Sequence, residues 1–375
     1  MVIRLKEPNL HNTGKAMTVR GPIDPDELGV TLLHEHLFIW SDASMGGRIP
    51  TTSTPATIAA KFDQKLIIEN LEFNRRHSRS IDDNYRFNDE KLVTPEAMEF
   101  KYYGGSTLVD LTNIGIRRDP HALLRVSNAT GLNIVMGSSW YVKSLYPPDM
   151  DSLTITDLEE TIIRDISIGV GDTGIRSGII GEVGIQGEPL TNNEIKVMQA
   201  SARASRATGA PISIHWGGTK NEKHQIADII QNEGGDLSRT VFGHSDLIAD
   251  DMDQMMRLLE RGIYIEFDIT GRVDVPLSWG FPNPDSPWLD YAEASLNALI
   301  ADTVCKLIEL GYIDRIILSQ DVCQKKQLKS HGGTGYSFLL EHFLPNLKKL
   351  GVSDKQIFTI MVENPKRVLT FAEPQ

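Results

Sequence analysis

Eight short runs of apolar and β-branched residues recur along the chain, and longer segments with helical spacing separate most of them. The runs are Thr31–Phe38, Ser106–Leu111, Asn133–Gly137, Ser177–Val183, Pro211–His215, Thr240–His244, Tyr264–Asp268 and Arg315–Asp321. This alternation is typical of a parallel sheet with crossover helices. Because there are eight such runs, we predict an α/β fold of the (β/α)8 TIM barrel type rather than an open sheet.

The segments between the runs have apolar residues three or four positions apart. Met252, Met255, Met256 and Leu259 show this spacing, which is the pattern of a helix packed on one side. The same spacing predicts helices over Asp157–Ile168, Asn193–Thr208, Lys223–Asn232, Ala249–Arg261, Ala292–Leu310 and Tyr336–Leu350.

The chain has 375 residues, 40% of them hydrophobic, and shows no break in composition, which predicts a single domain over residues 1–375. Residues 41–91 form a polar stretch between the first two runs and predict an enlarged insertion or loop region after the first strand. Such an insertion could be part of a lid over the barrel mouth or an excursion into solvent, and its charges favour neither interpretation.

The charge balance limits the classes of partner. Lys and Arg number 38 against 50 Asp and Glu, a formal net charge of -12, which argues against nucleic acid or an anionic membrane and favours a small-molecule substrate. Cys305 and Cys323 cannot make a disulfide framework, and the first residues lack the apolar core of a secretory signal. No apolar run approaches the roughly 20 residues that cross a bilayer. We expect a cytoplasmic protein that forms a homodimer.

Residues that commonly bind metals stand on five of the eight runs. His34 and His36 lie within the first run, one residue apart, so both imidazoles would project to the same face. The others stand at or near the carboxyl ends of later runs: Glu182, His215, His244 and Asp321. In a closed parallel barrel those ends meet at one mouth. Four imidazoles and two carboxylates would be costly to bury there without a cation, so the sequence predicts a metal centre.

Six ligands are more than one ion uses in an open catalytic site, where three protein ligands and a water are typical. The set therefore predicts two divalent metal ions. Glu182 could bridge them with its two carboxylate oxygens, and a water between the ions would become a hydroxide nucleophile. The ligand types favour zinc, although manganese, cobalt or iron would accept the same set.

The remaining histidines lie outside the ends of the runs, and we interpret most of them as solvated or locally capped. These are His11, His77, His121, His224 and His342. His331 stands in a glycine-rich loop after the eighth run, where it could face the substrate or help to turn the chain. Cys323 follows Asp321 by two residues, and we interpret it as a thiol without a role in the site.

Taken together, the motifs resemble the phosphotriesterase family of the amidohydrolase superfamily. The matching segments are Gly29–His36, Val109–Thr112, Gly178–Gly184, Ile214–His215, Phe242–His244, Ser319–Asp321 and Val362–Leu369. The resemblance implies that His34, His36 and Asp321 hold a buried metal, that His215 and His244 hold a more exposed one, and that Glu182 bridges both. The best-known members bridge with a carbamylated lysine, but residues 177–187 contain no lysine. In this respect the chain resembles the phosphotriesterase-related branch.

The resemblance also indicates residues around the substrate. Trp140 and Tyr141 match a segment with aromatic side chains at the mouth, although structural packing is an alternative role for Trp140. The lactonase branch carries an Asp-Arg-Tyr type of segment after the seventh strand, whereas this chain has Asp268 followed by Arg272 four residues later. This difference argues against acyl-homoserine lactones and leaves Arg272 as a candidate substrate-binding residue.

We therefore predict a binuclear metal-dependent hydrolase that cleaves a carboxylic ester, lactone or amide. Asp321 would accept the proton of the attacking hydroxide and deliver it to the leaving group. Phosphotriester hydrolysis uses the same groups and is the alternative reaction. A metal-containing binding protein without activity is a third interpretation, and the complete ligand set argues against it.

Overall fold

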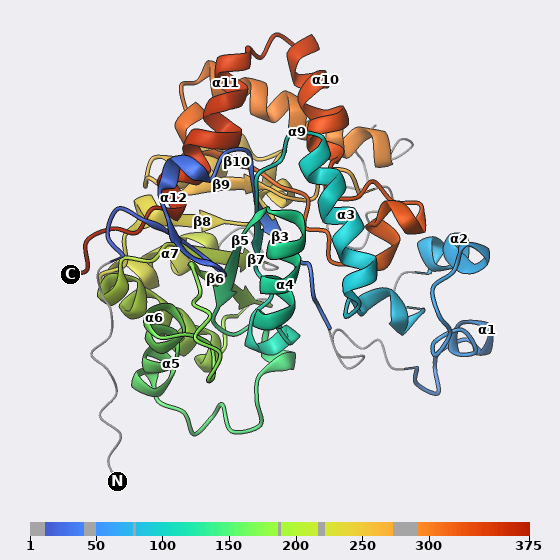
Figure 1. Cartoon of the computed structure of the whole chain (residues 1–375), viewed down its shortest axis with the longest axis horizontal. Helices are drawn as coiled ribbons and strands as arrows, with labels where there is room; N and C mark the ends of the chain where they lie inside the picture. Colours follow the sequence, from blue (N-terminus) through green and yellow to red (C-terminus); the bar gives the residue numbers. More distant parts are fainter. Residues whose placement is uncertain (1–11, 41–49, 78–79, 187–188, 217–221, 273–291) are drawn as a thin grey trace.

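The computed structural model describes residues 12–40, 50–77, 80–186, 189–216, 222–272 and 292–375. Eight parallel strands, in the order β3 to β10, form a nearly closed barrel surrounded by helices (Figure 1). The strands are β3 (Thr31–Glu35), β4 (Thr107–Asp110), β5 (Asn133–Ser138), β6 (Ile179–Ile185), β7 (Ile212–Trp216), β8 (Thr240–Phe242), β9 (Tyr264–Phe267) and β10 (Ile316–Leu318). The predicted (β/α)8 fold is confirmed, and each strand lies within or overlaps one of the eight predicted runs.

The barrel strands are buried on both faces, which explains their nearly continuous apolar sequences. Residues such as Leu33, Val109 and Ile317 form a cluster inside the barrel, together with residues from the hairpin of β1 (Ala16–Thr18) and β2 (Gly21–Ile23) and from α12 (Asn364–Leu369). Their neighbours, including Leu32 and Leu108, pack in the larger core beneath the helices. Apolar side chains therefore fill the barrel at the end that the hairpin and α12 cover, and the polar side chains lie at the opposite end.

The helices around the barrel largely follow the sequence prediction. Their bounds are α4 (Pro120–Thr130), α5 (Ile155–Ser167), α6 (Asn192–Thr208), α7 (Glu222–Asn232), α8 (Met252–Leu259), α9 (Ala292–Glu309), α10 (Leu344–Lys349) and α11 (Asp354–Phe358). The single helix predicted over Tyr336–Leu350 is instead a π-helical turn, Leu339–Phe343, that leads into α10. Helix α4 was not predicted, although Asp119 caps its first turn, Pro120 opens it and Gly131 ends it.

The insertion between β3 and β4 contains α1 (Ala56–Ala59), α2 (Ile68–Arg76) and the start of α3 (Glu90–Tyr102). Figure 1 shows α1 and α2 at one side of the barrel, where Leu66, Leu71 and Ile81 form a small separate cluster. The described part of the insertion packs against the loop that follows β10: the Arg75 guanidinium, for example, donates to the carbonyl of Gly332 at 2.9 Å. Residues 41–49 lie outside the described residues, and the lid and excursion interpretations both stay predictions.

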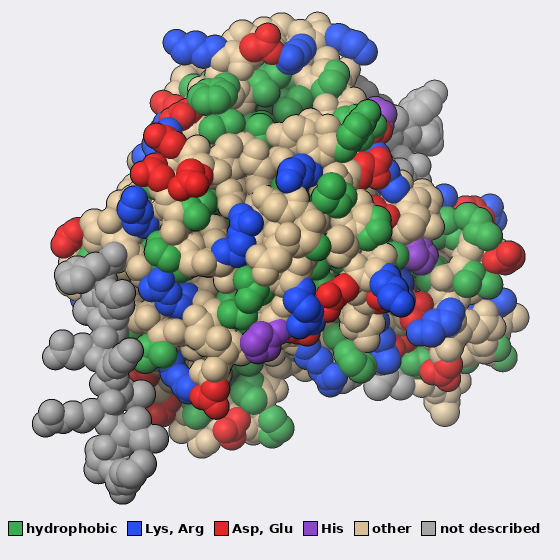
Figure 2. Space-filling model, viewed as in Figure 1, with side chains coloured by type: hydrophobic (Ala, Val, Ile, Leu, Met, Phe, Trp, Pro, Cys, Tyr) green, Lys and Arg blue, Asp and Glu red, His purple; other side chains and the backbone are tan. Residues whose placement is uncertain are grey.

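The surface carries charges of both signs. Figure 2 shows basic and acidic side chains interspersed over the face seen in Figure 1, as expected for a chain with 38 basic and 50 acidic residues. Within the described ranges, every helix is too short or too polar to span a bilayer.

Candidate metal centre

The six predicted ligands lie together at the carboxyl ends of the barrel strands. Glu182 and His215 lie on β6 and β7, whereas His244 and Asp321 follow the last residues of β8 and β10. The expectation that both His34 and His36 lie within a strand was wrong, because β3 ends at Glu35. The ladder stops there because the backbone N–H of Leu37 donates to the carboxylate of Asp110, at 2.6 Å, instead of to a strand carbonyl.

Two register shifts direct ligands into the mouth of the barrel. The pairing of β3 with β4 shifts between Leu32 and Glu35, and the pairing of β6 with β7 shifts between Ile180 and Val183. An irregularity of this kind breaks the simple alternation of a strand and can re-aim a side chain. These two shifts bracket His34 and Glu182, which both face the centre of the ligand set.

Glu182 is almost fully buried at the middle of the set, with 1% of its surface exposed. Its Oε1 atom lies 3.4 Å from Nε2 of His36. Its Oε2 atom lies 3.2 Å from Nε2 of His34 and 2.7 Å from Nδ1 of His215. One carboxylate therefore faces histidines of both groups that the sequence resemblance distinguishes.

Asp321 lies next to His36 and His34. Its Oδ1 atom lies 3.3 Å from Nε2 of His36 and 3.9 Å from Nε2 of His34, while Oδ2 accepts a hydrogen bond from the guanidinium of Arg272. Its φ of 45° lies in the left-handed region, which Asp tolerates better than most residues. The backbone N–H of Asp321 donates to the carbonyl of His34 at 3.0 Å, so the two ligands are fixed to each other through the main chain.

The other side of the set is more open. Nε2 of His244 lies 2.8 Å from Nδ1 of His215, and the side chain of His215 keeps 16% of its surface exposed, whereas that of His34 is fully buried. The hydroxyl of Tyr141 lies 3.3 Å from Nε2 of His215. His215 is the most exposed of the six side chains, whereas His244 and Asp321 are similarly buried, at 7% and 8% exposed, so the division into a buried and a more exposed metal stays a prediction.

The charges in the set are strongly coupled. Burial alone would lower the pKa of His36, but hydrogen bonds to Asp321 and Glu182 outweigh it and raise that pKa to about 9. Burial lowers the pKa of His215. Burial opposes ionisation of Glu182 as well, but His215 and His34 hold its pKa well below the usual range. The two carboxylates and the buried histidines thus form a site that favours cations.

The donor set fits divalent metal ions. Both ring nitrogens of His34 are buried, and neither makes a hydrogen bond of acceptable geometry to any described residue, although three carboxylates lie within 3.5 Å of them. A metal would satisfy a buried imidazole nitrogen that faces carboxylates in this way. Three overlapping sets each place their ligand atoms within 4.8 Å of one another: His34, His36 and Glu182; His34, His244 and Asp268; and Glu182, His215 and His244. Imidazole and carboxylate ligands suit zinc, manganese, cobalt or iron.

The structure adds buried acidic residues that the sequence interpretation did not single out as site residues. Glu266 on β9 and Asp268 just beyond it lie 3.5 and 3.0 Å from Nδ1 of His34. Glu35, the last residue of β3 and the neighbour of both His34 and His36, accepts hydrogen bonds from the backbone of Gln320 and Val322. Glu266 and Asp268 stand two residues apart in the predicted run Tyr264–Asp268, as His34 and His36 do in Thr31–Phe38, and this spacing was the available sequence signal.

The predicted substrate-binding residues take different positions. The Tyr141 ring packs against His215, with 4.6 Å between ring centroids, so it borders the ligand set. Trp140 and Tyr141 are both buried, at 4% and 7% exposed, and both belong to the main hydrophobic core, so the two roles considered for Trp140 stay predictions. Arg272 is buried, and its guanidinium donates to the carboxylate and, at 2.9 Å, to the carbonyl of Asp321. The guanidinium of Arg272 therefore contacts Asp321 directly.

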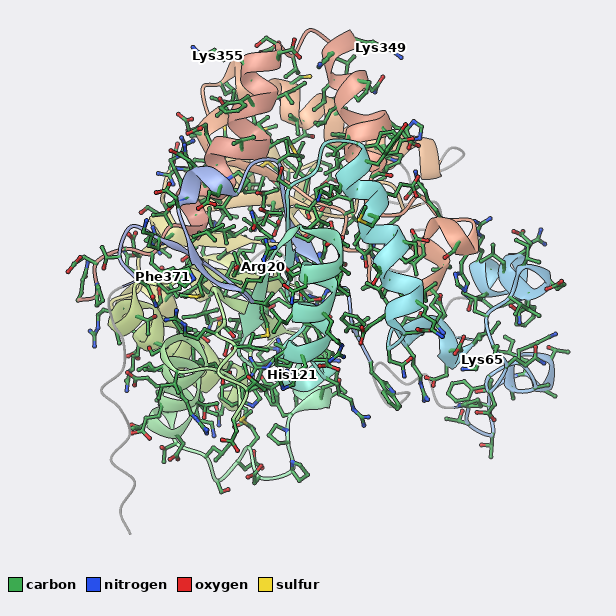
Figure 3. All side chains as sticks on the ribbon, viewed as in Figure 1. Arg20, Lys65, His121, Lys349, Lys355 and Phe371 are labelled. Carbon is green, nitrogen blue, oxygen red and sulfur yellow. The ribbon has the colours of Figure 1, made fainter. Side chains whose placement is uncertain are left out.

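The other histidines lie away from the set or outside the described residues. His121 is exposed near the start of α4 (Figure 3), and His77 and His342 are exposed too. His331 is half-buried, with its Nδ1 atom 3.1 Å from the hydroxyl of Ser330. His11 lies outside the described residues. The Cys323 sulfur lies 3.6 Å from the Arg272 guanidinium, beside Asp321.

Comparison with known proteins gives a consistent family. The sequence profile of the phosphotriesterase family matches residues 14–369. The protein named N-acetyltaurine hydrolase of Dictyostelium discoideum is 35% identical over 372 residues, which cover 95% of this chain and 98% of that protein. The protein of the same name in Xenopus tropicalis is 34% identical, with 96% and 99% covered. The crystal structure of a resiniferatoxin-binding protein from Rhodobacter sphaeroides superposes with a TM-score of 0.87 at 33% identity, covering 96% of this chain and 97% of that one.

Proposed function

Because the chain belongs to the phosphotriesterase family and relatives over nearly its whole length are named hydrolases, we propose that it is a metal-dependent amide hydrolase. The family confirms the predicted resemblance and the prediction of a hydrolytic enzyme. The observation that carries the proposal is the position of Glu182, whose two oxygens face histidines of two different groups. That arrangement supports a binuclear centre better than a single ion.

In this proposal His34, His36 and Asp321 would hold one divalent ion, His215 and His244 would hold the other, and Glu182 would serve both. Two such ions would make a water molecule acidic enough to act as hydroxide at neutral pH and would polarise the substrate carbonyl. The buried carboxylates keep the site attractive to cations, and the apolar barrel core below it keeps bulk water out.

In this proposal Asp321 accepts a proton from the nucleophile and donates it to the leaving group. Its Oδ2 atom is occupied by Arg272, so Oδ1, which faces His36 and His34, is the oxygen available to take the proton of the attacking hydroxide. An amide nitrogen leaves only after it has been protonated, and Asp321 delivers the proton to it. Arg272 acts through Asp321 by fixing the carboxylate in one orientation.

We infer the substrate class from the relatives and the site together. The relatives named N-acetyltaurine hydrolase suggest an acylated amine with a strongly acidic group at its far end. Tyr141 borders the more open side of the set and is our candidate for contact with the acyl group. Trp140 belongs to the same hydrophobic core as Tyr141 and would support it from there.

The substrate proposal is tested with a matched panel on zinc-loaded protein: N-acetyltaurine, an N-acetyl amino acid, neutral N-ethylacetamide, a lactone, a carboxylic ester and a phosphotriester. We expect the highest kcat/KM for an acidic N-acetyl compound and a much lower value for N-ethylacetamide. Fastest turnover of the phosphotriester would favour the alternative reaction. Two bound metal equivalents with no turnover of any compound would overturn the hydrolase proposal.

Asp321→Asn tests the proton transfer. The amide keeps the shape of the side chain but is a poor proton acceptor, so we expect kcat/KM to fall by about 10²- to 10⁴-fold. Metal content is measured in parallel, because Asp321 is also a proposed ligand. Unchanged kcat/KM for every substrate would remove Asp321 from the mechanism.

Glu182→Gln tests the bridge. The neutral amide cannot offer two anionic oxygens, so we expect weaker binding of both ions and a loss of kcat/KM of about 10³-fold or more. Elemental analysis of the purified variant gives the metal stoichiometry. Full occupancy with two equivalents would contradict the bridging role.

A further inference from the structure

The carboxylate of Asp268 lies close to the Nδ1 atoms of His34 and His244, one histidine from each group. Its carboxylate is fully buried, with Oδ1 2.7 Å from Nδ1 of His244 and Oδ2 3.0 Å from Nδ1 of His34. The backbone N–H of His244 also donates to Oδ2, at 2.9 Å. One side chain on the β9 side of the barrel therefore contacts one histidine of each group.

The opposite nitrogen of each histidine faces the centre of the ligand set. Nε2 of His34 lies 3.2 Å from Glu182, and Nε2 of His244 lies 2.8 Å from His215. If Nε2 holds a metal, Nδ1 carries a proton that a carboxylate can accept, which fixes both the tautomer and the orientation of the ring. Asp268 is placed to do this for both rings: Oδ1 forms a hydrogen bond with Nδ1 of His244 at 2.7 Å, and Oδ2 lies 3.0 Å from Nδ1 of His34, a contact that the structure shows outside hydrogen-bond geometry.

The surroundings hold Asp268 in one position. Its backbone N–H donates to Oδ2 of Asp246 at 2.9 Å. A Cβ atom at Gly243 would stand 3.1 Å from Oδ2 of Asp268 and 3.2 Å from Nδ1 of His34, so glycine leaves just enough room for this contact. The carboxylate, the imidazole and the glycine thus form one closely packed unit.

We propose that Asp268 is a positioning residue that couples the two metal positions, so that its loss loosens both. This inference rests on the proposed metal-dependent function. Glu266 provides a matched comparison, because it is equally buried on the same strand side but lies 3.5 Å from Nδ1 of His34 alone. Among the described residues, Asp268 is the carboxylate whose two oxygens are divided between the Nδ1 atoms of His34 and His244.

The test follows metal release from zinc-loaded protein after mixing with excess chelator. In Asp268→Asn an amide replaces the carboxylate, and its single oxygen can accept a hydrogen bond from only one of the two rings. We expect both zinc equivalents to leave about 10- to 100-fold faster than from the wild type. Glu266→Gln should accelerate the release of one equivalent at most. Faster release of only one equivalent from Asp268→Asn, or the same pattern in both variants, would overturn the coupling.

Gly243→Ala is a second variant that disturbs the contact while keeping the charge, and it decides the question if Asp268→Asn does not fold. Its methyl group would stand 3.1 Å from Oδ2 of Asp268 and from the carbonyl oxygen of Ile214, and 3.2 Å from Nδ1 of His34. The contact between Asp268 and His34 should therefore shift, so both release phases should again accelerate, and the visible absorption of the cobalt-substituted protein should shift. Unchanged release and an unchanged cobalt spectrum would contradict the proposal. Wild-type protein that binds metal without turnover would overturn the hydrolase proposal alone, whereas wild type that binds no metal would overturn both.

Discussion

Two carboxylates hold the loop after β10, one at its inner end and one at its outer end. At the inner end Glu35 lies 2.8 Å from Oγ of Ser319 and accepts hydrogen bonds from the N–H groups of Gln320, at 2.8 Å, and Val322, at 2.9 Å. At the outer end Asp83 of the insertion pairs with Lys325 of the loop at 2.8 Å. Asp321 lies within the inner contact, between Gln320 and Val322.

The two carboxylates have opposite surroundings. Burial raises the pKa of Glu35 to about 8, although the hydrogen bonds from Val322 and Ser319 oppose the increase. Burial would also raise the pKa of Asp83, but Lys325 and Lys65 outweigh it and hold that pKa below its usual value of 3.8. At the inner end the chain therefore uses hydrogen bonds to a fully buried carboxyl group, and at the outer end it uses charge pairs, one of them with the exposed Lys65. We infer that the inner end sets the position of Asp321, and that the outer end only docks the insertion.

Glu35→Gln should give the largest loss of stability in this comparison. The amide offers one acceptor oxygen and turns an N–H₂ group toward a backbone donor, so we expect the free energy of unfolding of the metal-free protein to fall by about 1–3 kcal/mol. Chemical denaturation measures the change. Glu266→Gln is the matched control, because Glu266 is equally buried but its carboxylate oxygens accept no hydrogen bond from the described residues. Equal losses in both variants would show that the hydrogen bonds of Glu35 are not the source of its effect.

The barrel could be predicted from the sequence because each strand is buried on both faces and reads as an apolar run. The six ligands could be predicted because parallel strands bring their carboxyl ends to one mouth. Glu35 stands between His34 and His36, yet its role could not be predicted, since the sequence does not show how β10 meets β3 to close the barrel. Asp268 was missed for a related reason: its partners lie on β3 and after β8, and only the closed barrel brings them together.

The insertion was the least predictable part. Helix α2 contributes Leu71 to a cluster of three apolar side chains, and its Arg75 donates a hydrogen bond to the loop after β10. Asn84 illustrates the difficulty: it donates to Gln324 and accepts from the backbone of Lys326, two contacts across more than half of the chain. Polar contacts of this kind leave no periodic signal in a sequence.

Asp83→Asn should cost less than Glu35→Gln, about 1 kcal/mol at pH 7, because its charge pairs are partly solvated. The sign of the pH dependence follows from the lowered pKa of Asp83. A carboxyl with a lowered pKa contributes stability above its ordinary value of 3.8, and the contribution is lost as the pH falls through the lower value of the folded protein. The difference in unfolding free energy between wild type and Asp83→Asn should therefore shrink when the pH is lowered from 7 to 3. A difference that grows in acid would contradict this assignment.

The smallest effect should come from the two lysines that pair with Asp83, and their difference tests whether exposure sets the strength of the outer contact. Lys65 lies on the insertion (Figure 3) with 81% of its side chain exposed, whereas Lys325 is 13% exposed. We expect Lys65→Met to change the unfolding free energy by less than about 0.5 kcal/mol, and Lys325→Met to cost more. Salt at 1 M should abolish the effect of Lys65→Met, because it screens an exposed pair almost completely, and leave part of the effect of Lys325→Met. Equal losses from the two substitutions, each abolished by salt, would mean that burial does not strengthen the outer contact, and the contrast between the two ends of the loop would then rest on Glu35 alone.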